Sequence, residues 1–101
     1  MQINLDEVNV VHNPDAFRFE VRIDDYLARL DYRMAEESII FSHTGTPPAL
    51  QGQGIAGKLV RAGLAYAREN KLKVVPQCTY VAAYIRKHPE YQPLLQEDAK
   101  E

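Results

Sequence analysis

The spacing of the apolar residues changes near Gly45, and this change constrains the fold more than any other feature. In the segments 17–24 and 28–34 every second residue is apolar, and charged residues occupy the positions between them. A period of two predicts β-strands with one buried face and one solvated face. After Gly45 the apolar residues recur every three or four positions, as one face of a helix requires. The chain is therefore expected to form strands first and a helix afterwards.

Five segments have the apolar content and the turn boundaries of strands: 8–11, 17–23, 28–34, 39–44 and 72–75. The turns between the first four are short, which favours an antiparallel meander. The segment 39–44 is expected to be buried on both faces. The segments 53–70 and 81–87 are predicted helices. Because a helix connects the fourth and fifth strands, these two strands are expected to run parallel.

The predicted inner faces of the second and third strands contain Phe17, Phe19, Val21, Ile23, Ala28, Leu30, Tyr32 and Met34. The charged residues between them, including Glu20, are expected on the outer faces. The sequence thus predicts one α/β (α+β) domain over 1–95 with a mixed, mostly antiparallel sheet. A polar tail is expected over 96–101.

Charge and cysteine content narrow the class of protein. A net charge of −2 gives no general attraction to nucleic acid or to an anionic membrane, so neither is an expected partner. Cys78 is the single cysteine, which rules out an internal disulfide. The first residues lack the basic start and apolar run of a signal peptide, and no apolar stretch approaches the roughly 20 residues that cross a bilayer. A cytoplasmic location is expected.

Gly52, Gly54 and Gly57 form a G-x-G-x-x-G pattern where the first helix is predicted to start. Such glycines let backbone N–H groups approach a phosphate, and the helix N-terminus adds its positive end. A dinucleotide site would need a strand running directly into the glycines and a carboxylate roughly 20 residues beyond them. The loop 46–51 and the residues around Gln77 provide neither. An acyl-coenzyme A site and a glycine-rich helix start without a ligand remain as interpretations.

Two segments carry a resemblance to a known family. Gln51-Gly52-Gln53-Gly54-Ile55-Ala56 matches the Q/R-x-x-G-x-G/A motif of the GNAT-type N-acetyltransferases. The segments 75–78 and 84–91 resemble a group of small, single-domain GNAT-like proteins. The resemblance implies a minimal GNAT-like fold and acetyl-CoA, or another acyl-CoA, as cofactor. The cofactor-binding residues that it implies are Phe41, His43, Thr44, Gln51, Gly52, Gln53, Gly54, Ile55, Ala56, Gly57 and Lys58.

Three residues are candidates for the chemistry of acyl transfer, which needs a base for the amine and an acid for the thiolate. Tyr84 resembles the tyrosine with which GNAT-like enzymes protonate the CoA sulfur, and Tyr80 and Tyr91 compete for this role. His43, near the end of the fourth strand, suits proton removal at neutral pH. Cys78, at the start of the last helix, could accept the acyl group or simply lie beside the thioester. Packing or surface positions are the structural alternatives for each.

One departure from the wider GNAT family leaves the function open. A full-length GNAT domain has helices between its first two strands, whereas this chain has only Asn13-Pro14-Asp15 there. The donor half is therefore expected to be intact and the acceptor half largely missing. The resemblance implies an N-acyltransferase with an unknown amine acceptor, possible acceptors including a protein or peptide. The alternative is a non-catalytic CoA-binding or protein-interaction module.

Overall fold

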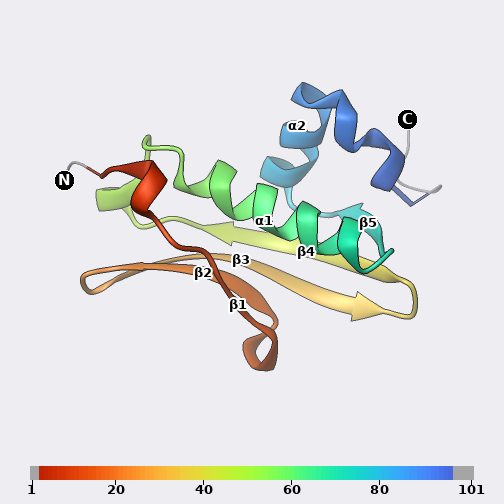
Figure 1. Ribbon diagram of the computed structural model, residues 1–101, viewed down its shortest axis with the longest axis horizontal. Helices are drawn as coiled ribbons and strands as arrows, with labels where there is room; N and C mark the ends of the chain where they lie inside the picture. The colour runs from red at the N-terminus through yellow and green to blue at the C-terminus, as the bar shows by residue number, and fades with distance from the viewer. Residues whose placement is uncertain (1–2, 97–101) are drawn as a thin grey trace.

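The computed structural model describes residues 3–96 as a five-stranded mixed sheet with two α-helices packed on one of its faces (Figure 1). The strands and helices are β1 (Val11–Asn13), β2 (Arg18–Ile23), β3 (Tyr26–Ala35), β4 (Ser38–Gly45), α1 (Ile55–Glu69), β5 (Lys73–Pro76) and α2 (Thr79–Lys87). None of the helices within residues 3–96 is long and apolar enough to cross a membrane.

The strands lie in the order β1-β2-β3-β4-β5, which confirms the predicted topology. The first four strands form an antiparallel meander, and β4 and β5 run parallel. The parallel pairing is short, because it begins at Ser38↔Lys73 and ends at Phe41↔Pro76. β5 thus ends at Pro76, one residue beyond the predicted end at position 75.

The core lies between α1 and the sheet. Ala28 and Leu30 of β3 and Phe41 of β4 are fully buried beneath the helix. A side chain on Gly63 would bring its Cβ within 2.9 Å of the Phe41 ring and 3.0 Å of a Leu30 methyl carbon. Gly63 therefore sets the close approach of α1 to the sheet.

Three predictions about burial are wrong. Phe17 is 53% exposed because it precedes β2 in a left-handed conformation, with φ 55°, and so lies outside the alternation of the strand. Met34 is 43% exposed because it belongs to the end of the β3–β4 hairpin, where residues 33–37 are all exposed. β4 is not buried on both faces. Ile39 and Phe41 are buried on one face, whereas His43, which a register shift between β3 and β4 places on the other face, is exposed.

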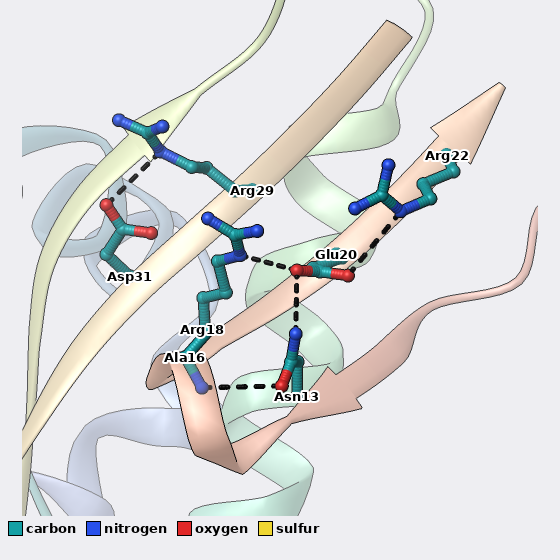
Figure 2. Close-up of polar contacts among 7 residues, drawn as sticks. All are labelled: Asn13, Ala16, Arg18, Glu20, Arg22, Arg29 and Asp31. Carbon is teal, nitrogen blue, oxygen red and sulfur yellow. Dashed lines mark hydrogen bonds and ion pairs between the residues drawn. The ribbon is translucent and has the colours of Figure 1, made fainter. Parts of the chain in front are cut away.

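Glu20 is a fourth departure, because it lies on the predicted outer face but is only 5% exposed. Arg18 Nε donates to its carboxylate at 2.5 Å, Asn13 Nδ2 donates at 3.1 Å, and Arg22 Nε lies 3.8 Å away (Figure 2). The hydrogen bond from Arg18 holds the pKa of Glu20 below its usual value, against the opposing effect of burial. The side chains of Arg18 and Asn13 cover this carboxylate.

The ends of the elements differ slightly from the predicted ones. Val8 and Val10 pack against the core but precede β1. α1 begins at Ile55, two residues after the predicted start. α2 begins at Thr79, two residues before its predicted start. Gln96 donates its backbone N–H to the carbonyl of Val74, so it belongs to the folded domain, and the rest of the predicted tail lies outside the described residues.

Candidate functional site

The glycine-rich loop ends in the N-terminus of α1. Gly52 and Gly54 have φ values of 78° and 86°, a left-handed conformation that favours glycine. Gly54 is the N-cap of α1, and its carbonyl accepts the N–H of Lys58 at 3.1 Å. The N–H groups of residues 55–57, between Gly54 and Lys58, therefore have no acceptor within the helix. Such a group of oriented donors favours an anion.

A cleft of about 440 Å³ lies beside this loop. Its walls come from the end of β4, the loop, the first turn of α1 and the first turn of α2. The predicted cofactor-binding residues in its lining are Thr44, Gln51, Gly52, Gly54, Ile55 and Ala56. A Cβ on Gly52 would have no atom within 4 Å, so the approach to the loop is open there.

The parallel strands separate at the same end of the sheet. Their pairing stops at Phe41↔Pro76, while β4 continues to Gly45. The chain after β5 turns into α2, and Cys78 donates its N–H to the carbonyl of Phe41 at 2.9 Å. Beyond that bond, the edge of β4 over 42–45 faces no paired strand among the described residues. An extended ligand could therefore lie along this edge.

The N-terminal segment engages two of the predicted cofactor-binding residues. Gln53 Oε1 accepts the N–H of Ile3 at 3.1 Å, and Lys58 Nζ donates to the carbonyl of Leu5 at 2.5 Å. A Leu5 methyl carbon lies 3.0 Å from the position of a Cβ on Gly54. These contacts hold Gln53 and Lys58 against the N-terminal segment. Neither residue lines the cleft.

Tyr84 is packed in the helix, and Tyr80 lines the cleft in its place. The Tyr84 ring stacks on His88 with their centroids 4.0 Å apart, and Tyr84 is only 9% exposed. His88 Nδ1 lies 2.8 Å from the carbonyl oxygen of Tyr84. Tyr80, one turn earlier, is 41% exposed. Partial burial, reinforced by Tyr84, raises the pKa of Tyr80 above its usual value, while Arg61 opposes the shift.

Cys78 and His43 lie on opposite sides of β4. Cys78 is buried, and its Sγ lies 3.6 Å from Oγ1 of Thr44, a residue that lines the cleft. His43 is exposed and pairs across the strands with Asp31 on the other face of the sheet. The structure thus brings Cys78 and Tyr80 to the side of the loop, and it places His43 on the side away from α1.

The remaining predicted residues lie outside the cleft. Phe41 is fully buried in the core. Gly57 is buried as well, and a Cβ there would lie 3.6 Å from the hydroxyl of Tyr80. A larger cavity of about 570 Å³ lies between the N-terminal segment and β2, with Glu7 and Arg22 in its lining. The glycine loop is not part of that cavity, so the smaller cleft is the stronger candidate site.

A family model described as GCN5-related N-acetyl-transferase matches residues 18–94. The chain therefore belongs to the GCN5-related N-acetyltransferase family. The matched span begins with β2 and includes the glycine-rich loop and both α-helices.

Similar proteins include curated relatives and a solved structure. The chain is 28% identical to Protein NATD1 of Xenopus tropicalis over 85 residues, which are 81% of this chain and 78% of the relative. It is 29% identical to Protein NATD1 of Mus musculus, with 81% of this chain and 77% of the relative covered. A GCN5-like protein from Staphylococcus aureus, solved by NMR, superposes with a TM-score of 0.70 at 30% identity, with 87% of each chain covered.

Proposed function

We propose that this chain is an acyl-CoA-dependent N-acyltransferase that uses acetyl-CoA and binds it in the cleft beside the glycine loop. The observation that carries the proposal is the pair of left-handed glycines, Gly52 and Gly54, at the N-terminus of α1. They lie next to an open strand edge, as a ligand with a pyrophosphate and an extended arm requires. Family membership supports the same assignment.

The residues around the cleft fit such a cofactor. The N–H groups of the first turn of α1 would hold the pyrophosphate, and none of the cleft-lining residues is a carboxylate that would repel it. The edge of β4 over 42–45 offers backbone groups to the pantetheine arm. The bound cofactor supplies the acyl group as a thioester. Lys58 has no assigned role because the carbonyl of Leu5 already binds its ammonium group.

Two residues are proposed to move the protons of the reaction. Tyr80 would protonate the departing thiolate, since Tyr80 lines the cleft and Tyr84 is packed against His88. His43 would take a proton from the acceptor amine on the other face of β4, and the amine would reach the thioester where the pairing of β4 with β5 has ended, beyond Phe41↔Pro76. Cys78 lies beside Thr44 at the cleft, where it could hold the acyl group or only line the thioester site. Acetyl-CoA incubation followed by intact-mass measurement separates these two roles.

We expect Tyr80→Phe to lower kcat for acetyl transfer by about 100-fold, the usual lower range for a lost general acid, with little change in acetyl-CoA affinity. Tyr84→Phe is the matched control, because it removes the same hydroxyl one helical turn away, and it should keep kcat within about threefold. Release of the CoA thiol in the presence of a panel of amines measures both variants. A larger loss in Tyr84→Phe would contradict the assignment of the acid to Tyr80.

The short connection between β1 and β2 supports a second candidate function, a CoA-binding module without transferase activity. The connection between β1 and β2 is one 3-10 turn, Pro14–Ala16, so no α-helix forms an acceptor wall there. Both candidates bind CoA. Only the transferase releases the CoA thiol in proportion to an acylated amine, so the amine panel distinguishes them.

A further inference from the structure

The sheet face away from the helices carries an excess of arginines. α1 and α2 both lie on the opposite face (Figure 1). Six charged residues of β2 and β3 alternate with buried residues and so point to the uncovered face: Arg18, Glu20, Arg22, Arg29, Asp31 and Arg33. Their net charge of +2 contrasts with the net charge of −2 of the whole chain. These two strands therefore have a local excess of positive charge on the uncovered face.

Two of the arginines flank the position of His43. In the sheet Asp31 pairs with His43, Arg29 pairs with Gly45, and Arg33 pairs with Ile40. Paired residues share a face, so His43 lies in a row between the rows of Arg29 and Arg33. A Cβ on Gly45 would lie 3.6 Å from Arg29 and 3.7 Å from Nε2 of His43, so both side chains approach the end of β4.

Both flanking arginines retain donors for a ligand. Arg33 Nη2 donates to the neutral amide of Gln77 at 3.0 Å, and within residues 3–96 Arg33 makes no ion pair. Arg29 Nε is buried 3.2 Å from a carboxylate oxygen of Asp31, without a hydrogen bond, so the donors left for a ligand are its terminal Nη groups, which have no hydrogen-bond partner within residues 3–96. The Arg29 side chain is 42% exposed. Arg18, by contrast, is engaged with the buried Glu20.

We propose, on the basis of the proposed transferase function, that the acceptor is a lysine in an extended peptide segment with acidic residues on both sides of it. The lysine amine would lie at His43 and Asp31. The carboxylates on its two sides would bind Arg29 and Arg33. Asp31 attracts the incoming ammonium group, and the two arginines select the flanking charges.

The spacing of the two arginines favours a peptide over a small anionic amine. Arg33 lies four positions after Arg29 in β3, which corresponds to about 13 Å along a strand. A small amine with one carboxylate or phosphate cannot contact both guanidinium groups and also present its nitrogen at His43. An extended peptide with acidic residues two positions before and after the lysine spans the same length.

Three synthetic peptides of equal length test the proposal. Each has blocked termini and one central lysine, with Glu, Gln or Arg two positions on either side of it. Acetyl transfer is followed by CoA thiol release and by peptide mass. We expect kcat/KM for the Glu peptide to exceed that for the Gln peptide by about 5- to 10-fold, as two partly exposed ion pairs provide. The Arg peptide should be the poorest, and added salt should reduce these ratios.

Variants locate the selectivity on the surface. The double variant Arg29→Gln/Arg33→Gln should bring the Glu-to-Gln ratio close to one and keep acetyl-CoA affinity. Arg22→Gln, the matched control, removes the same charge from the same face at the far end of β2 and should keep the ratio. Equal or better transfer to the Arg peptide, or a ratio retained in the double variant, would overturn the proposal. Absence of transfer to all three peptides would overturn this inference. The proposed function is contradicted only if CoA thiol release also fails with the amine panel.

Discussion

An Ala56→Asp variant is expected to lose measurable binding of acetyl-CoA and to remain as stable as the original protein or to become slightly more stable. Ala56 is in the first turn of α1 and lines the cleft. A carboxylate there would repel the pyrophosphate. At an effective dielectric constant of about 20, two unit charges about 5 Å apart interact by about 3 kcal/mol, which corresponds to about 100-fold in affinity.

The same carboxylate should not destabilise the protein, so a loss of acetyl-CoA binding in Ala56→Asp can be distinguished from a loss of stability. A negative charge in the first turn of a helix is favourable by about 0.3–1 kcal/mol. Ala65→Asp is the matched control, because it introduces the same charge at an exposed position of α1 away from the cleft. It should keep acetyl-CoA affinity. Calorimetric titration and thermal unfolding of both variants test this, and unchanged affinity in Ala56→Asp would place the cofactor elsewhere.

Gly63→Ala is expected to destabilise the protein by about 1–3 kcal/mol, the usual cost of forcing an extra carbon into a packed core. The new Cβ would lie 2.9 Å from two carbons of the Phe41 ring, which is fully buried. Phe41 is also the last residue of β4 that pairs with β5, so its displacement would strain the parallel pairing. The sign of this change in unfolding free energy is informative. Helix propensity alone would make Gly63→Ala stabilising, because alanine is the better helix former by about 1 kcal/mol.

Gly57→Ala is the matched control for this prediction. It makes the same substitution in the same helix, but the nearest atom to the new Cβ is 3.6 Å away, an ordinary contact. Helix propensity then determines the effect on stability, and we expect Gly57→Ala to raise the free energy of unfolding by up to about 1 kcal/mol. Urea unfolding of both variants gives the two values. Stabilisation by Gly63→Ala would show that α1 does not approach β4 as closely as described.

The period of the apolar residues predicted the sheet order because local patterning and connection length determine it here. A helix between β4 and β5 requires these two strands to be parallel, and short turns make the others antiparallel. The burial of Glu20 was not predictable from alternation alone. It depends on Arg18 and Asn13 covering the carboxylate, and these contacts form only after β1 pairs with β2.

The candidate site was predictable only in part. The glycine pattern located the loop, because positive φ values favour glycine. Tyr80 and Tyr84 differ by one helical turn and share a helix face, so sequence spacing did not decide which of them lines the cleft. The stacking of Tyr84 on His88 decides it. The contacts of Gln53 and Lys58 with the N-terminal segment join residues about fifty positions apart, and no local pattern indicates them.

An NMR titration of the isotope-labelled protein with acetyl-CoA tests most directly whether the cleft beside the glycine loop is the cofactor site. The protein has a mass of 11.5 kDa, so the amide signals can be followed individually. We predict that the largest shifts occur at the amides of 52–57 and 44–46, with small changes at Glu7 and Arg22 in the larger cavity. No shifts at millimolar acetyl-CoA, or shifts confined to the larger cavity, would contradict the assignment.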